Sequence, residues 1–253
     1  MGRVIAISNQ KGGVGKTTTA INLSACLAEK GKRVLTIDMD PQGNTTSGLG
    51  IDKSTVEHTS YQLLTNETTI WEAMTPSIVP GLSVIASERS LAGAEIELIG
   101  VEDREFILKK EVDKVRDNYD FVIIDCPPSL NTLTVNAMTT ADTVLVPIQC
   151  EYYALEGLSE LIYTIELVKE RLNNKLEIEG VVFTMYDART CLSLQVVENV
   201  KQNLHQNIYK TIIPRNVRLS EAPSYGMPII TYDPKSKGAK AYDKLAKEFI
   251  KRA

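Results

Sequence analysis

Short apolar runs alternate along the chain with longer segments in which apolar residues recur at helical spacing. The short runs are rich in Val and Ile and contain few polar positions, as is typical of strands covered on both faces. They predict strands at Val4–Ile7, Val34–Asp38, Leu82–Ala86, Phe121–Asp125, Thr143–Pro147, Gly180–Thr184 and Tyr209–Ile213. The longer segments predict helices at Thr17–Lys30, Leu91–Ile99, Arg104–Asn118, Leu130–Thr139, Leu155–Leu172, Leu192–Leu204 and Gly238–Lys251.

This alternation predicts an α/β fold of the doubly wound type, with a mostly parallel sheet and helices on both faces. A ligand should then bind at the carboxyl ends of the strands. No repeat, low-complexity tract or linker interrupts the pattern, and residues 43–69 form only a polar, irregular stretch. We therefore expect a single domain over residues 1–253.

The composition is compatible with a folded cytoplasmic protein. Hydrophobic residues make up 43% of the chain, which is enough for a core, yet no apolar run approaches the roughly 18 residues of a membrane span. Met1-Gly-Arg leads directly into the first predicted strand, so no signal peptide is expected. The four cysteines lack metal or redox spacing, which favours a reducing compartment.

A glycine-rich segment joins the first predicted strand to the first predicted helix. Strand, glycine-rich loop and helix form the context of a phosphate-binding loop, in which successive backbone N–H groups point at one oxyanion. Lys16 can neutralise the β- and γ-phosphates, and the Thr17 hydroxyl can ligate Mg²⁺. The predicted nucleotide-binding residues are Lys11, Gly12, Gly13, Val14, Gly15, Lys16, Thr17 and Thr18.

Carboxylates follow two further strands. Asp38 and Asp40 lie on a common side at the end of the second predicted strand, where they either cap a turn or act on Mg²⁺ and the attacking water. Phe121–Asp125 has the form of a Walker B strand, whose terminal carboxylate reaches Mg²⁺ through water, although strand-end capping is an alternative for Asp125. The predicted metal site comprises Thr17, Asp38 and Asp125.

The loop departs from the general phosphate-binding pattern at Gln10, which replaces a glycine, and at the additional Lys11. Gln10–Thr18 resembles the deviant Walker A loop of the ParA/MinD ATPases, although a solvated surface charge is the alternative for Lys11. The resemblance extends from residue 3 to about residue 250. It implies ATP and Mg²⁺ as cofactors, an ATP-dependent homodimer in which Lys11 contacts phosphate in trans, and weak ATPase activity with Lys11, Lys16 and Asp40 as catalytic residues.

Further segments resemble the Soj branch of this family. The segment 147–157 is similar to a dimer-interface segment, in which Glu151 matches a ribose-contacting position. By the same resemblance Met185 and Pro214 are expected near adenine. Met185 stands where a GTPase would carry the lysine of its guanine motif, which favours ATP.

The C-terminal region is basic, because residues 205–253 contain ten Lys and Arg and only four acidic residues. The whole chain, in contrast, has a formal net charge of −4 at pH 7. This asymmetry favours a polyanion contact. Arg189 and Arg218 match DNA-contacting positions of Soj proteins, whereas local ion pairs are the alternative for both. The resemblance implies non-specific double-stranded DNA binding, a ParB-like partner that stimulates hydrolysis, a nucleoid-associated role in chromosome or plasmid partitioning, and an influence on replication initiation or sporulation. The predicted DNA-binding residues are Arg189, Arg215, Arg218, Lys235 and Lys237.

Three other functions share parts of these motifs. A MinD-like ATPase for division-site placement would lay a C-terminal amphipathic helix on anionic lipid. Residues 242–250 carry such an apolar stripe, although the final helix of this fold needs the stripe to dock on the sheet. An iron–sulfur ATPase is disfavoured because no cysteine occurs between Cys26 and Cys126, and a bacterial tyrosine kinase is disfavoured because Tyr242 alone is no tyrosine cluster.

Overall fold

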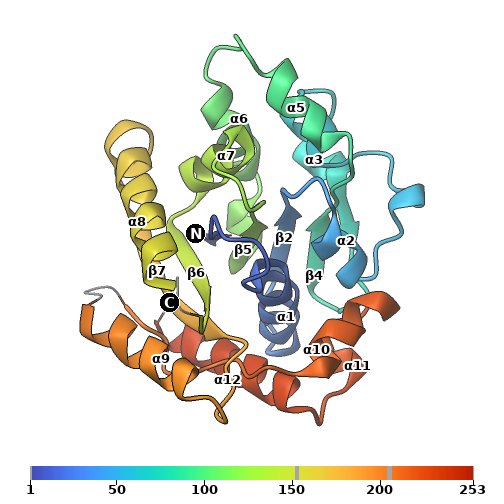
Figure 1. Cartoon of the computed structure of the whole chain (residues 1–253). Coiled ribbons are helices and arrows are strands. Elements are labelled where there is room, and N and C mark those ends of the chain that lie inside the picture. Colours follow the sequence, from blue (N-terminus) through green and yellow to red (C-terminus); the bar gives the residue numbers. More distant parts are fainter. Residues whose placement is uncertain (1, 152–153, 204–206, 253) are drawn as a thin grey trace.

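A seven-stranded sheet forms the centre of the molecule, seen here in a computed structural model that describes residues 2–151, 154–203 and 207–252. Its strand order is β3-β4-β2-β5-β1-β6-β7, and every neighbouring pair is parallel except β3 with β4 (Figure 1). The doubly wound α/β prediction is confirmed. The strands are β1 (Arg3–Ile7), β2 (Val34–Asp38), β3 (Met74–Pro76), β4 (Leu82–Ile85), β5 (Phe121–Asp125), β6 (Thr143–Gln149) and β7 (Glu177–Thr184).

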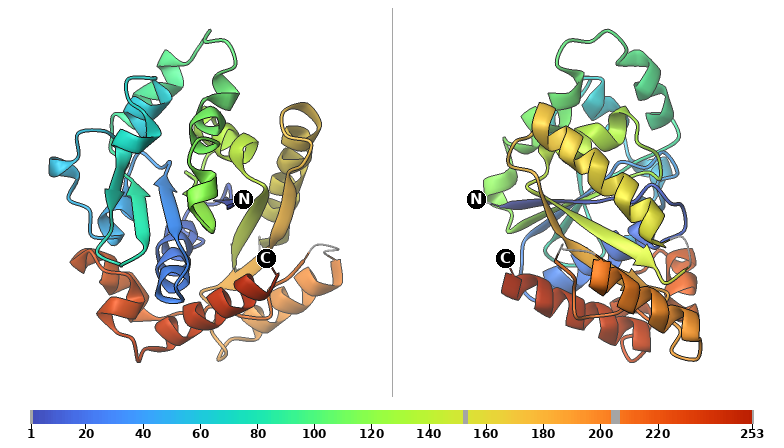
Figure 2. Two further views of the ribbon diagram at one scale, coloured as in Figure 1. Left: turned by 180° about the vertical axis from the view of Figure 1, so that it is seen from behind. Right: turned by 60° about the vertical axis from the view of Figure 1, so that its left-hand side comes forward.

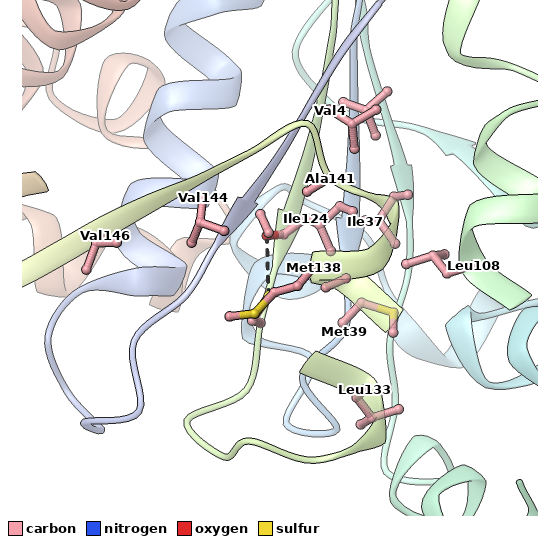
Figure 3. Close-up of a cluster of buried hydrophobic side chains, with 14 of the residues drawn as sticks. Val4, Ile37, Met39, Leu108, Ile124, Leu133, Met138, Ala141, Val144 and Val146 are labelled. Atoms are coloured by element: carbon pink, nitrogen blue, oxygen red, sulfur yellow. Dashed lines mark hydrogen bonds between the residues drawn. The ribbon is translucent and has the colours of Figure 1, made fainter. Parts of the chain in front are cut away.

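Helices cover both faces of this sheet, which explains why its strands are almost wholly apolar. In β5, Val122 and Ile124 face one hydrophobic cluster and Phe121 and Ile123 face the other. Figure 3 shows part of the first cluster, in which Ile124 lies among side chains of neighbouring strands and of the helix that follows β5. Alternate residues of one strand therefore contribute to two separate cores.

Six helices occupy regions where the sequence predicts helix: α1 (Lys16–Glu29), α5 (Leu91–Glu97, predicted over Leu91–Ile99), α7 (Thr132–Thr140), α8 (Ala154–Arg171), α9 (Cys191–Asn203) and α12 (Lys237–Arg252). Leu204, the last residue of one predicted helix, lies outside the described residues. The other helices are α2 (Asn44–Gly48), α3 (Ser60–Leu64), α4 (Ile70–Ala73), α6 (Ile107–Val112), α10 (Val217–Glu221) and α11 (Ile229–Tyr232). Single 3₁₀ turns occur at η1 (Lys53–Thr55), η2 (Arg104–Phe106), η3 (Arg116–Asn118) and η4 (Ala222–Tyr225).

The predicted strand at Tyr209–Ile213 is wrong. Tyr209 and Ile213 donate backbone hydrogen bonds to β7, but between them the amides of Lys210 and Thr211 donate to the Glu248 carboxylate of α12, at 2.8 and 2.9 Å. The segment therefore does not form a continuous series of β-sheet hydrogen bonds with β7. The seventh strand is instead β3, a three-residue edge strand that is too short to give a periodic signal.

The predicted helix at Arg104–Asn118 is broken into η2, α6 and η3. Asn136 of α7 accepts from the Leu108 amide at 3.2 Å and donates to the Arg104 carbonyl at 2.8 Å. These are the two groups that would otherwise pair within one α-helix. Residues 43–69 were expected to be irregular, but they contain α2, η1 and α3.

The last helix docks on the protein core. In α12 the side chains of Tyr242, Leu245, Ala246 and Phe249 are buried in the second hydrophobic cluster. Figure 2 shows this C-terminal helix (red) packed against α1 (blue). None of the helices in the described part of the chain has the length and apolar content needed to cross a bilayer.

Candidate nucleotide-binding site

The loop between β1 and α1 has the backbone conformation that its glycines predict. Gly13 and Gly15 have φ angles of +76° and +91°, in the left-handed region that side chains disfavour. Gly15 is the N-cap residue directly before α1, so the unpaired N–H groups of a 14-residue helix face the loop. The Thr184 hydroxyl at the end of β7 donates to the Val14 carbonyl at 2.7 Å and anchors the loop to the sheet.

Lys16 lies inside this loop. Its residue is only 7% exposed, and its Nζ donates to the Lys11 carbonyl at 3.1 Å. Burial lowers the pKa of Lys16, while the nearby carboxylates of Asp125 and Asp40 oppose that shift. An anion bound in the loop would favour the charged form of the ammonium group.

Asp125 forms the floor of the site. The hydroxyls of Thr17 and Thr45 both donate to its Oδ2, at 2.9 and 2.7 Å. Its buried Oδ1 has no hydrogen-bond partner among the described residues. Burial raises the pKa of Asp125, and the nearby Asp38 raises it further. An unpaired carboxylate oxygen beside a threonine hydroxyl fits Mg²⁺, which proteins hold through one or two carboxylates plus substrate phosphates.

Asp38 is the neighbour of Asp125 in the β2–β5 register, yet its contacts differ. Its Oδ2 accepts from the amide and the hydroxyl of Thr46, at 2.8 and 2.7 Å, and its Oδ1 accepts from the Asp40 amide at 3.1 Å. These contacts support the turn-capping alternative for Asp38, in which its carboxylate holds the backbone that follows β2. Burial raises its pKa, despite the bonds from Thr46.

Asp40 and the phosphate-binding loop share one cavity of about 350 Å³. The Asp40 carboxylate accepts from the Gln42 amide at 2.9 Å, and the Ser87 hydroxyl donates to the Asp40 carbonyl at 2.7 Å. The carboxylate therefore stands at the phosphate end of the sheet, where sequence reasoning expected it. The cavity is lined by Gly12, Gly13, Gly15, Lys16, Thr17, Thr18, Asp40, Asn44, Pro128 and Met185.

Lys11 points to a different partner. Its Nζ forms an ion pair with Glu151 Oε2 at 2.8 Å, and the two side chains are 39% and 45% exposed. Lys11 is therefore held at the surface in the single chain rather than buried beside Lys16. Tyr152 and Tyr153 of the predicted dimer-interface segment lie outside the described residues.

The predicted adenine-contacting residues line a second cavity of about 390 Å³. Met185 adopts a φ of +51°, and the next residue donates its amide to the Ile213 carbonyl, which brings Met185 and Pro214 together. Gly15, Thr18 and Met185 line both cavities, so this cavity continues from the phosphate end. Arg215, predicted as a DNA contact, also lines it.

The other predicted DNA-binding residues lie on the surface. Arg189 pairs with Asp187 at 2.7 Å, and Arg218 pairs with Glu221 at 2.8 Å and Asp233 at 3.6 Å. These are the local ion pairs that the sequence left open as an alternative. The Arg189 guanidinium lowers the pKa of the Asp187 carboxyl. Lys235 and Lys237, just before and at the start of α12, are exposed and form no ion pair within the described residues.

Sequence reasoning missed the residues that hold these carboxylates. Thr45 contacts Asp125 and Thr46 contacts Asp38, both from α2. The signal available was the run Asn44-Thr-Thr-Ser directly after the aspartates, which offers consecutive side-chain donors at the phosphate end.

Comparison with known proteins agrees with this geometry. A family model described as an AAA domain matches residues 2–178. The chain is 58% identical to the sporulation initiation inhibitor protein Soj of Bacillus subtilis, over 98% of both chains. It is 52% identical to the chromosome partitioning protein ParA of Myxococcus xanthus, over 100% of this chain and 89% of that protein.

A solved structure with the same fold carries nucleotide. Cobyrinic acid a,c-diamide synthase from Mycobacterium smegmatis, with a bound ATP analogue and magnesium, superposes with a TM-score of 0.86 at 37% identity, over 98% of this chain and 93% of that one. Because full-length relatives share more than half of its residues and its loop has the expected geometry, the chain belongs to the Soj/ParA family of chromosome-partitioning proteins.

Proposed function

We propose that this protein is a weak Mg²⁺-dependent ATPase that dimerises around ATP, binds DNA without base readout and partitions chromosomes or plasmids with a ParB-like partner. The observation that carries the proposal is the convergence of Lys16, Thr17 and Asp40 on one cavity above the unpaired Asp125 oxygen. The ATP analogue and magnesium of the M. smegmatis structure support the choice of nucleotide and metal.

The residues of this cavity divide the chemistry among them. Backbone N–H groups and the Lys16 ammonium bind the phosphates and offset the charge that develops on them. Thr17 and Asp125 would hold Mg²⁺, which would offset negative charge on the phosphates. Asp40 would orient the attacking water and accept a hydrogen bond from it, while Asp38 keeps the Asp40 backbone in place.

Dimerisation would use Lys11. Its ion pair with Glu151 is half exposed, and such pairs contribute only about 0–1 kcal/mol. Lys11 can therefore leave Glu151 at little cost and contact phosphate across a dimer, while Glu151 becomes free to meet a ribose hydroxyl. ADP lacks the γ-phosphate and should leave the protein mostly monomeric.

DNA binding would use the exposed basic residues near the second cavity. Arg189 and Arg218 are paired with carboxylates, but exposed pairs are weak enough to exchange for phosphate. Contacts to phosphate alone carry no base readout, so binding should be indifferent to sequence and the protein should associate with the nucleoid. Dimerisation doubles the number of contacts.

Membrane attachment is the alternative function. The burial of the apolar stripe of α12 disfavours it. Phe249 and Leu245 are fully buried in the core, so the stripe is not available to lipid in this conformation. The full-length Soj and ParA relatives support partitioning.

A pair of substitutions tests the assignment. Asp40→Ala should bind ATP, dimerise and lose hydrolysis by orders of magnitude, because the water loses its orienting group. Lys16→Ala should lose ATP binding or dimerisation. The measurements are phosphate release, ATP binding and size-exclusion chromatography with ATP or ADP. Full ATPase activity in Asp40→Ala would refute the assignment.

A further inference from the structure

A basic groove lies on the exposed side of α12, near the end of the chain. It is a cavity of about 510 Å³ whose walls include five cationic side chains and a single carboxylate. A cavity of this size is typical of small-molecule sites. We call it the α12 groove, and the residues that line it are Lys210, Thr211, Lys244, Lys247, Glu248, Lys251 and Arg252.

The one carboxylate of the α12 groove is occupied by the protein itself. Glu248 accepts hydrogen bonds from the amides of Lys210 and Thr211 at 2.8 and 2.9 Å, from the Thr211 hydroxyl at 2.8 Å and from Arg252 Nη2 at 2.7 Å. Only 17% of its side chain is exposed. Glu248 therefore does little to neutralise the lysine ammonium groups around the cavity.

Most of these ammonium groups lack a partner. Lys247 pairs with Asp243 at 2.7 Å. Lys210, Lys244 and Lys251 are exposed, and none of the three forms an ion pair within the described residues. Like charges gathered around one cavity repel one another, so an anion that enters the cavity lowers the electrostatic free energy of the protein.

Arg252 adds a fixed donor to this set of flexible lysines. Its guanidinium carbon lies 4.0 Å from the centroid of the Tyr209 ring, and its Nη2 donates to the Ile208 carbonyl at 2.9 Å as well as to Glu248. In the part of the chain that the structure describes, its Nε and Nη1 groups donate to no acceptor. They remain available to the oxygens of an anion, and a guanidinium held by stacking loses little freedom when it binds one.

The α12 groove lies at the opposite end of the sheet from the nucleotide cavity. Arg252 also lines a neighbouring cavity together with Arg3, Thr143 and Glu177, which are the first residues of β1, β6 and β7. The nucleotide cavity lies at the carboxyl ends of the strands, and Arg189 follows the carboxyl end of β7. The groove is therefore separate from both the nucleotide cavity and that proposed DNA contact.

We propose that the α12 groove is an anion site that binds a compact oligophosphate, which is a molecule with two or more adjacent phosphate groups. The molecule is either a free inorganic chain or the phosphate part of a nucleotide. Each lysine ammonium group is a mobile point charge with three donors, which suits clustered phosphate oxygens, while the lysine stems supply apolar wall. This site goes beyond the proposed function and does not depend on it.

The test is isothermal titration calorimetry of the full chain with inorganic tripolyphosphate, at fixed ionic strength and without Mg²⁺. The Lys16→Ala background suppresses binding at the phosphate-binding loop. In that background, Lys210→Ala/Lys251→Ala should weaken tripolyphosphate binding roughly tenfold or more, because two charged hydrogen-bond donors are lost. Lys169→Ala/Lys175→Ala removes two exposed lysines near the end of α8 and should leave binding unchanged.

Pyrophosphate and ADP distinguish the two sources of the ligand, because both carry a diphosphate. Tighter binding of ADP that is lost in Lys210→Ala/Lys251→Ala would assign a nucleotide to the groove, and equal binding would assign a free phosphate chain. The double variant keeps the backbone amide that Lys210 donates to Glu248, so the fold around the groove should persist. Thermal unfolding checks this.

Three results would overturn the proposal. One is the absence of tripolyphosphate binding, and another is an equal loss of binding in Lys169→Ala/Lys175→Ala, which would show attraction to overall charge alone. The third is duplex DNA that displaces tripolyphosphate and loses as much affinity in Lys210→Ala/Lys251→Ala as in Arg189→Glu, which would make the groove part of a DNA surface. Failure of ATP hydrolysis or dimerisation in the parent protein would refute the proposed function while leaving tripolyphosphate binding intact.

Discussion

At the scale of single residues, Asp125 carries an energetic cost that Mg²⁺ would relieve. Burial raises its pKa, so the folded state binds a proton more tightly than the unfolded state. Stability of the nucleotide-free protein therefore falls as pH rises from about 4, the ordinary carboxyl pKa, through the raised value.

Asp125→Asn should weaken that dependence and leave the part that comes from Asp38, whose pKa burial also raises. We expect a higher free energy of unfolding at pH 8 than in the parent protein, by about 1 kcal/mol or more, and a flatter pH profile. Urea unfolding between pH 5 and 9 measures both. Added Mg²⁺ with ATP should stabilise the parent protein and leave Asp125→Asn unaffected. A parent-like pH profile in the variant would contradict the raised pKa.

At the scale of elements, α12 is held by a buried aromatic cluster. The Phe249 ring meets Phe121 of β5 edge-on at 5.5 Å and stacks on Tyr209 at 6.3 Å. Phe249→Ala should therefore destabilise the protein by about 3–5 kcal/mol. Lys251→Ala, on the exposed face of the same helix, should change stability by less than about 0.5 kcal/mol. Thermal unfolding measures both changes in stability. If the two variants lost equally little stability, the apolar stripe of α12 would not be docked on the core, and lipid binding would again be a candidate function.

For the whole molecule, we expect that the proposed dimerisation can be blocked without harm to the fold. A Cβ added at Gly12 meets nothing within 4 Å in the single chain, and Gly12 does not have a left-handed φ. Gly12→Val should therefore fold and bind ATP but fail to dimerise, because two such loops would meet across the nucleotides. Size-exclusion chromatography in the Asp40→Ala background checks this. If the Gly12→Val/Asp40→Ala protein still dimerised with ATP, the two loops would not meet in the dimer.

The proposed DNA binding also involves the whole molecule, because two subunits would supply the contacts. Each phosphate contact adds roughly 0.9 to the slope of log K against log salt, so ATP should about double the slope seen with ADP. Arg189→Glu or Arg218→Glu should abolish binding to any sequence and spare dimerisation and basal hydrolysis. Arg33→Glu, another exposed arginine paired with an aspartate, is the matched control. Binding that ignores nucleotide or survives both reversals would defeat the mechanism.

Features that depend on near neighbours in the chain could be predicted from the amino-acid sequence. The glycines of the loop, the apolar strands and the carboxylates at the strand ends follow from local conformational preference and from burial on both faces. For this reason β2, β5 and the loop lie where predicted, and Lys16, Thr17, Asp40 and Asp125 meet at one edge of the sheet.

Features that depend on partners distant in the chain could be seen only in the folded protein. Asn136 takes the backbone groups that would have continued a helix through Arg104 and Leu108, and Glu248 takes the amides that would have completed a strand at Lys210 and Thr211. A buried backbone group must find a hydrogen-bond partner, and a side chain brought near by packing can provide it as well as the adjacent turn or strand. The spacing of apolar residues along the sequence gives no sign of such a distant hydrogen-bond partner.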